Sequence, residues 1–226
     1  FYGWGGCGAE PIWTIDEGND YPRLYWENKP GEIIKPISLS DFLLGSGMQD
    51  DPYLIHTAEE SNLVTLAVCD WDEHFKLMAN IDLTGFSYDG PLIAPNTSLE
   101  DGDSQRIPFT GVFDGNGHII SHLFIEGGSY LGLFGGLASG AEVRDLGVVE
   151  IDINGSGFYC GGLAGCNFNG IVANCYSSGR VRGNGQVGGL VGHNDGSIIT
   201  CSSAALVIAR DEYVGGLVGR NLDSIM

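Results

Sequence analysis

Four glycine-rich segments of one pattern recur in the second half of the chain, and their regular spacing constrains the fold more than any other feature. The final glycines of these segments are 30, 27 and 27 residues apart. An asparagine follows closely after three of them, at Asn167, Asn194 and Asn221. Repetition at a fixed period is typical of stacked structural units. The segments are Tyr130–Gly135, Cys160–Gly165, Val187–Gly192 and Val214–Gly219.

Each unit of about 27 residues holds roughly three short strand-like runs, divided by Gly, Asn, Ser or Asp turns. Apolar residues show no sustained 3.6-residue period here, so stacked pairs of helices are not expected. Propeller blades need about 40–50 residues, which excludes that alternative. A unit this small cannot bury its apolar face alone, whereas strands stacked about 4.8 Å apart extend one core along an axis. The spacing therefore predicts an all-β solenoid, a parallel β-helix.

The composition narrows the choice of partners. The 226 residues include 37 glycines, 29 acidic residues and 10 basic ones, for a net charge of −19. Such a surface repels nucleic acid and anionic membranes. No apolar run approaches the ~18 residues needed to span a bilayer, so we expect no membrane insertion within these residues.

The Gly-Gly-Leu-Val-Gly-x-Asn segments resemble the GLUG repeat of large bacterial extracellular proteins. Two upstream stretches, 74–83 and 109–121, resemble the opening coils that precede such repeats, and 51–60 resembles their usual entry segment. The resemblance covers about residues 47–226. It implies a right-handed β-helix like that of pectate lyases, without lyase chemistry, and a location outside the cell or on its surface.

The resemblance also divides the chain. Residues 1–27 look like the closing segment of a preceding module, although they could instead dock sideways on the following helix, and residues 28–47 would form a junction. The β-helix is then expected over 48–226, with opening coils at 70–125 and GLUG-type repeats at 130–226. Because the pattern stops within a unit, we expect further repeats and any targeting signals outside these residues.

A short helix is expected at 57–68. Thr57-Ala-Glu-Glu60 has the spacing of a capping box. Leu63, Leu66 and Ala67 would share one face of that helix. An open β-helix exposes a sheet edge at each end. The helix is therefore predicted to cover the N-terminal edge.

Two cysteines occupy equivalent places in successive repeats, Cys175 and Cys201, and Leu146 matches them one coil earlier. They would stack as part of an inward ladder of apolar residues, or lie close enough to form a disulfide. Cys160 and Cys166 flank a glycine turn and could pair locally. The six cysteines include no Cys-x-x-Cys, so no zinc site is expected.

Two acidic groupings raise the question of a metal. Asp70, Asp72 and His74 would alternate along a strand and share one face, where a solvated surface is the favoured interpretation. Calcium is the one cofactor considered. Its oxygen ligands would come from a long loop and a glycine-rich turn that lack EF-hand or nonapeptide spacing, so plain turns are favoured. These ligands are Asp101, Asp103, Asp114 and Asn116.

A basic strip stands out on so acidic a chain. Arg180 and Arg182 alternate around Val181, and Arg210 occupies nearly the same place one coil later. The strip could contact an acidic glycan or a neighbouring acidic subunit. The alternative is ordinary solvated surface.

The repeats lack the stacked carboxylate pairs that β-helical polysaccharide enzymes need. His-Glu-x-x-His and Gly-x-Ser-x-Gly are also absent. We therefore expect a non-catalytic structural or adhesive module that contacts other copies or flanking modules and assembles into an extracellular fibre. The alternatives are a carbohydrate-binding module, for which the repeats offer few aromatic residues and no tryptophan, and part of a polysaccharide lyase or hydrolase.

Overall fold

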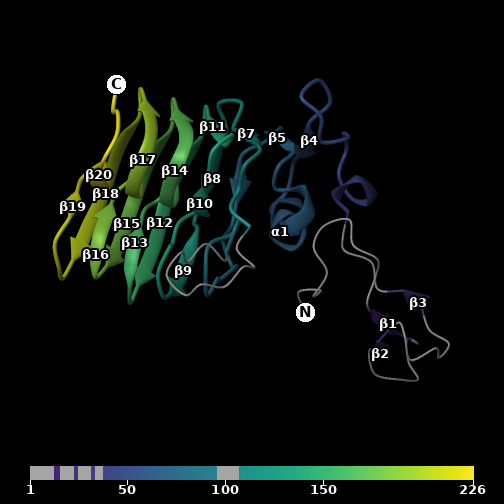
Figure 1. Cartoon of the computed structure of the whole chain (residues 1–226), viewed down its shortest axis with the longest axis horizontal. Helices are drawn as coiled ribbons and strands as arrows, with labels where there is room; N and C mark the ends of the chain where they lie inside the picture. Colours follow the sequence, from purple (N-terminus) through teal and green to yellow (C-terminus); the bar gives the residue numbers. More distant parts are fainter. Residues whose placement is uncertain (1–12, 16–22, 25–31, 34–37, 96–106) are drawn as a thin grey trace.

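The computed structural model describes residues 13–15, 23–24, 32–33, 38–95 and 107–226, and the predicted parallel β-helix is confirmed. Figure 1 shows the strands of successive coils side by side, from the blue N-terminal coils to the yellow C-terminal ones. Three parallel sheets run along the solenoid. A small antiparallel sheet precedes it, formed by β1 (Trp13–Ile15), β2 (Arg23–Leu24) and β3 (Glu32–Ile33).

Successive coils add parallel strands to these sheets, and among the described residues the three-stranded sheet is formed by the last three coils only. The eight-stranded sheet contains β4 (Tyr53–Ile55), β5 (His74–Leu77), β7 (Val112–Asp114), β10 (Phe134–Leu137), β11 (Glu142–Arg144), β14 (Ala164–Ala173), β17 (Val191–Ile199) and β20 (Val218–Asn221). The six-stranded sheet contains β6 (Ile81–Asp82), β8 (Ile119–Ser121), β9 (Phe124–Gly127), β12 (Gly147–Gly155), β15 (Tyr176–Gly183) and β18 (Ser202–Ala209). The three-stranded sheet contains β13 (Phe158–Cys160), β16 (Gly185–Gly188) and β19 (Val214–Gly215).

The register of the coils reproduces the spacing of the glycine-rich segments. Ala164 pairs with Val191 and Val191 with Val218, which are steps of one repeat each. Phe134 pairs with Ala164, so the longer first interval is one longer coil. Backbones approach closely at the repeated glycines: a Cβ on Gly192 would lie 2.6 Å from the backbone nitrogen of Cys160. A side chain at this place would therefore push neighbouring coils apart.

Left-handed backbone conformations form the corners of the coils. One corner has φ between 52° and 54° at Asn116, Asp145, Asn174 and Thr200, one residue per coil. Asn and Asp tolerate this region better than most residues, because their short polar side chains bond locally. The turn residues of the sequence pattern therefore mark the corners, where the chain passes from one sheet to the next.

The helix α1 (Ala58–Leu66) begins with the predicted capping box. The Glu60 backbone nitrogen donates to the Thr57 hydroxyl at 3.1 Å, and the Thr57 nitrogen donates to the Glu60 carboxylate at 3.2 Å. The predicted face was wrong in part, because Leu66 at the last helical position is 54% exposed. Ala67 is buried as predicted, and Val64, three positions earlier, is buried in place of Leu66, since residues three apart share the inward face.

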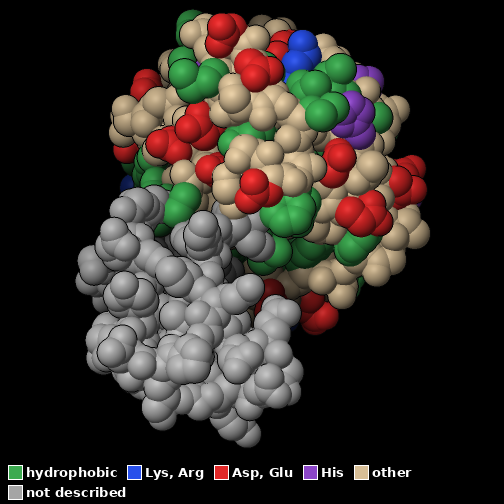
Figure 2. Space-filling model, turned by 90° about the vertical axis from the view of Figure 1, so that its right-hand side faces the viewer, with side chains coloured by type: hydrophobic (Ala, Val, Ile, Leu, Met, Phe, Trp, Pro, Cys, Tyr) green, Lys and Arg blue, Asp and Glu red, His purple; other side chains and the backbone are tan. Residues whose placement is uncertain are grey.

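The first coil also begins earlier than expected. Strand β4 precedes α1 and already pairs in parallel with β5, so the helix is inserted between the first two rungs. The Leu54 nitrogen on β4 donates to the Leu44 carbonyl at 2.8 Å, which gives the outer edge of β4 a partner. Two short 3-10 helices flank this region, η2 (Leu39–Asp41) and η3 (Val68–Asp70). Figure 2 looks onto this end and shows acidic side chains scattered across it.

The prediction of a closing segment at residues 1–27 falls mostly outside the described residues. Within 1–47 the structure gives strands β1, β2 and β3 and the helix η2. The role assigned to this part of the chain stays a prediction.

Candidate functional site

Asp70, Asp72 and His74 do not lie on one strand, so that prediction was wrong. Asp70 ends η3, a turn follows, and β5 begins only at His74. The Asp70 carboxylate accepts a hydrogen bond from the Leu39 nitrogen at 3.0 Å and so ties η2 to the first coil. Burial raises the pKa of Asp70, and the neighbouring Asp72 adds to the rise. The described residues contain no group of His, Cys, Asp and Glu that could hold a metal ion.

The residues considered for calcium do not come together in the part of the chain that is described. Asp101 and Asp103 lie outside the described residues. The Asp114 carboxylate accepts from the Asn116 nitrogen at 2.7 Å and from the Arg144 guanidinium at 3.1 Å. A carboxylate held by a guanidinium is a poor place for a second cation. Asp114 and Asn116 therefore shape a turn at a coil corner.

Cys175 and Cys201 lie in register on adjacent coils, beneath Leu146. Both are free thiols, and the Cys175 nitrogen donates to the Cys201 sulfur at 3.3 Å. Hydrogen bonding from Cys175 lowers the pKa of Cys201 to about 7, while the pKa of Cys175 is raised. The structure thus presents the ladder arrangement, with two sulfurs in contact and unbonded.

The other cysteines differ in their environment. Cys160 and Cys166 are buried free thiols and form no disulfide with each other. Burial raises the pKa of Cys160 to about 12 and that of Cys166 well above its usual value. These two thiols are therefore inert core residues. Cys69 in η3 is disulfide-bonded.

Two arginines of the basic strip lie on strand β15, and the third lies just after strand β18. Arg180 and Arg182 project outward from β15, where their register partners on β18 are Leu206 and Ile208. Arg210 follows β18, and its nitrogen donates to the Asn184 carbonyl at 3.0 Å. Arg210 therefore lies beyond the rung of Arg182, at the corner after the sheet. Arg210 was expected to stack nearly on Arg182, but its position along the strand differs by two residues.

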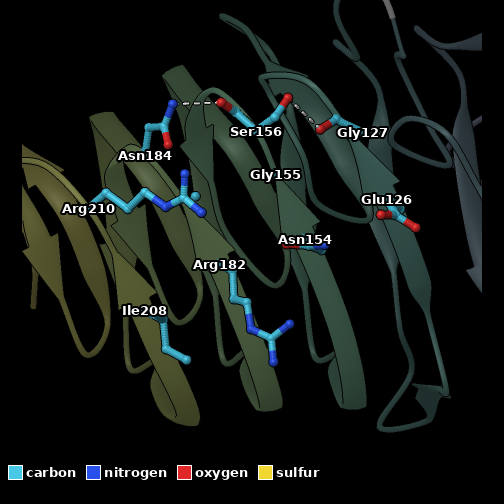
Figure 3. Close-up of a pocket in the computed structure, with 10 residues that line it drawn as sticks. Glu126, Gly127, Asn154, Gly155, Ser156, Arg182, Asn184, Ile208 and Arg210 are labelled. Carbon is cyan, nitrogen blue, oxygen red and sulfur yellow. Dashed lines mark hydrogen bonds between the residues drawn. The ribbon is translucent and has the colours of Figure 1, made fainter.

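Arg182 and Arg210 nevertheless line the same groove, of about 570 Å³, on the outer face of β9, β12, β15 and β18. We call it the arginine groove. Figure 3 shows Arg182 and Arg210 from neighbouring coils on one side of it, and Glu126 at the other. Between them lie Asn154, Gly155 and Ser156 of β12 and its corner, with Gly127, Gly183, Asn184 and Ile208 completing the lining.

Backbone register and local hydrogen bonds fix the shape of the arginine groove. Glu126, Asn154, Arg182 and Ile208 form one rung across four strands. At the corner, the Asn184 side-chain nitrogen donates to the Ser156 carbonyl at 2.6 Å, and the Ser156 hydroxyl donates to the Gly127 carbonyl at 3.2 Å. Hydrogen bonds within the solenoid therefore hold this polar wall in place.

Arg180 lines a separate, smaller groove of about 350 Å³, together with Glu150, Asp152 and Leu206. Its guanidinium lies 3.7 Å from the Asp152 carboxylate. This surface pair contrasts with Arg182 and Arg210, whose guanidinium groups have no ion-pair partner among the described residues. The basic strip thus contains one neutralised arginine and two unneutralised ones.

One cluster was missed from the sequence. The His122 imidazole lies 2.8 Å from the Asp82 carboxylate through Nδ1 and 2.8 Å from the Glu150 carboxylate through Nε2. The three residues come from three successive coils and all are exposed. Hydrogen bonds from Thr84 and His122 lower the pKa of Asp82. His122 is 40 residues from Asp82 and 28 residues from Glu150 in the sequence. These unequal separations predict that the three side chains meet only if the length of the opening coil is known.

No helix in the described part of the chain is long and apolar enough to cross a membrane. The chain is 35% identical over 139 residues to a "putative Gly-rich membrane protein" of Evansella cellulosilytica, an alignment that covers 60% of this chain and 15% of that protein. It is 36% identical over 154 residues to halomucin of Haloquadratum walsbyi, covering 66% of this chain and 2% of halomucin. The chain thus spans a small part of the length of these relatives.

A crystal structure described as a "putative immunoglobulin A1 protease" from Bacteroides ovatus superposes with a TM-score of 0.50 at 20% identity. The match covers 80% of this chain and 64% of that one, and it shows a shared fold alone. The model of the GLUG motif matches residues 156–182 and 183–208, which are the coils that carry β13 to β18. Residues 156–208 of the chain therefore contain two GLUG motifs.

Proposed function

We propose that this chain is a non-catalytic structural and adhesive module of a large secreted or cell-surface protein. One observation carries the proposal: three parallel sheets run in register through the repeat coils, so that each coil is fixed by both neighbours. Such a solenoid is a stiff rod with long exposed sides, suited to spacing and contact. Other copies of the module, flanking modules and glycans are the expected partners.

The similar proteins, a disulfide and the net charge also support this proposal. The relatives are named as a membrane protein and a halomucin, and halomucin is far longer than the matched region. The disulfide at Cys69 fits an oxidising compartment. A net charge of −19 favours solubility outside the cell and disfavours contact with nucleic acid.

The proposal also requires that the surface perform no turnover. His122 with Asp82 and Glu150 is the strongest acid–base cluster in the described residues. All three side chains are exposed, and the pKa of Asp82 is lowered, whereas a carboxyl acting as general acid needs a raised pKa. The cluster therefore fits a structural role, in which polar contacts join three successive coils.

The test has two parts. Antibodies against the chain should label intact cells of the source organism, and electron microscopy of the native material should show elongated particles or fibres. The purified chain should release no new reducing ends from acidic or neutral polysaccharides. Turnover that is lost in His122→Gln would overturn the proposal, as would labelling confined to permeabilised cells.

A further inference from the structure

We propose that the arginine groove binds a saccharide bearing carboxylate or sulfate groups. This inference rests on the proposed adhesive function and names its ligand class. Three of the five arginines in residues 107–226 have interaction partners. Arg144 binds Asp114 and Glu142, Arg180 lies beside Asp152, and Arg220 lies over the Tyr213 ring at 5.1 Å.

The remaining two arginines, Arg182 and Arg210, meet at one groove without an ion-pair partner among the described residues. Arg182 is half-buried against the sheet, which limits the freedom of its side chain, whereas Arg210 is exposed. On a chain with 29 acidic residues, two uncompensated guanidinium groups at one place form a local positive site. A guanidinium presents its donors in a fork that matches the two oxygens of a carboxylate or sulfate.

The rest of the lining matches the hydroxyl groups of a sugar. The amide of Asn154 and the hydroxyl of Ser156 lie between the arginines and Glu126, and the amide of Asn184 lies beside Arg210. Ile208 adds an apolar contact on the rung of Arg182. Glu126 can accept hydrogen bonds from hydroxyl groups, and it repels a negative charge at its own end of the groove. The ligand would therefore place its acidic group at the arginine end and neutral hydroxyls toward Glu126.

The dimensions suit a short oligosaccharide segment. From Glu126 to Ile208 the groove crosses three strand spacings, which is about 14 Å. Its volume of about 570 Å³ lies within the usual range for ligand sites. The groove is open along the side of the rod, so a longer chain could continue past it. The acidic surface elsewhere would repel a polyanion, which makes binding depend on these two arginines.

The experiment is isothermal titration of the full chain at low ionic strength. The probes are trigalacturonic acid, the neutral galactotriose and a sulfated disaccharide derived from heparin. We expect one or both acidic probes to bind at least about tenfold more tightly than galactotriose. Arg182→Gln and Arg210→Gln should each weaken that binding about tenfold, because each removes a charge-assisted hydrogen bond.

Arg180→Gln is the matched control, since it removes the same charge from the same strand β15 at a residue already paired with Asp152. It should change binding by less than about twofold. Unchanged melting temperatures would verify that the variants fold, as expected for outward side chains.

Several results would overturn the inference. These are no binding of either acidic probe, equal losses in Arg180→Gln and Arg182→Gln, or an effect of Arg182→Gln on self-association and none on saccharide binding. The last result would assign the groove to an acidic segment of a second copy. Failure here without polysaccharide turnover would leave the adhesive function standing, whereas turnover would overturn that function itself.

Discussion

The opening coils and the repeat coils share one fold but are held together by different chemistry. Across the opening coils and the first repeat segment, four phenylalanines form a cluster with ring centroids 5.1 to 6.2 Å apart: Phe75, Phe109, Phe113 and Phe134. All four are fully buried. The repeat coils contain no comparable cluster among their buried residues. Their interior carries Leu, Val, Cys and a row of buried asparagine side chains.

The asparagine row connects each repeat to the next. The Asn167 side-chain nitrogen donates to the Asn194 side-chain oxygen at 2.8 Å, and Asn194 donates in the same way to Asn221 at 2.8 Å. Identical residues one repeat apart can continue this pattern through any number of coils. The row begins at Asn167, because its register partner one coil earlier is Leu137, and bulky rings fill the interior next to it. One region is stabilised by a local cluster and the other by a repeated neighbour interaction.

The largest expected effect comes from breaking the aromatic cluster. Phe113→Ala removes a buried ring that packs on Phe75 and Phe134, and it leaves a cavity. We expect the free energy of unfolding to fall by about 3–5 kcal/mol. Denaturant unfolding followed by circular dichroism measures the total loss. Hydrogen exchange read by mass spectrometry should place the loss of protection in residues 53–137, which include β10 with Phe134.

The control for this variant is Phe124→Ala. Phe124 points outward from β9 and is 40% exposed, so its loss should cost less than about 1 kcal/mol. Equal losses from the two variants would contradict the assignment of the cluster as the core of the opening coils.

The repeat coils could be predicted from the sequence far better than the opening coils. Because the coils repeat, the spacing of Gly165, Gly192 and Gly219 predicts which strands pair, and Thr57 and Glu60 predict where the helix begins. In the opening region, alternation of polar residues suggested a strand at Asp70 where the chain forms a 3-10 helix and a turn. Local alternation cannot distinguish these when the loops around it differ in length.

The candidate site was predicted only in part, for the same reason. The arginine strip was visible from the repeat, but the pairing of Arg180 with Asp152 was not. Asp152 lies one coil earlier, and its register partner follows from strand pairing through a bulge between Val148 and Ile151. A bulge of this kind shifts every later residue on the strand. Clusters that cross several irregular coils, such as His122 with Asp82 and Glu150, depend on these shifts.

The second largest effect is expected from a disulfide between two repeat coils. Oxidised glutathione should join Cys175 and Cys201 in a disulfide, with two molecules of reduced glutathione formed. The link closes a loop of 26 residues, and we expect it to raise the free energy of unfolding by about 2–4 kcal/mol. Because the thiolate is the nucleophile and the pKa of Cys201 is about 7, the rate should rise as the pH increases through 7.

Intact mass and the melting temperature before and after oxidation measure this effect. Cys175→Ser provides the control and should show neither the mass change nor the stabilisation. A rate that does not depend on pH between 6 and 8, as rough limits around the lowered pKa, would contradict the arrangement of the two sulfurs.

The smallest effect tests the asparagine row itself. Asn194→Ala leaves the buried Gly196 carbonyl without the donor that now lies 2.7 Å away and breaks the bonds to both neighbouring asparagines. We expect a loss of about 1–3 kcal/mol, since the cost comes from an unpaired buried polar group. Asn221→Ala is the matched variant, with the same side chain in an exposed place, and should cost less. Hydrogen exchange decides the comparison, because Asn194→Ala should lower protection in the coils on both sides, whereas Phe113→Ala should act on the opening coils and on the segment around Phe134. Equal losses from Asn194→Ala and Asn221→Ala would mean that the stacked strands, and not the buried amides, hold the repeats together.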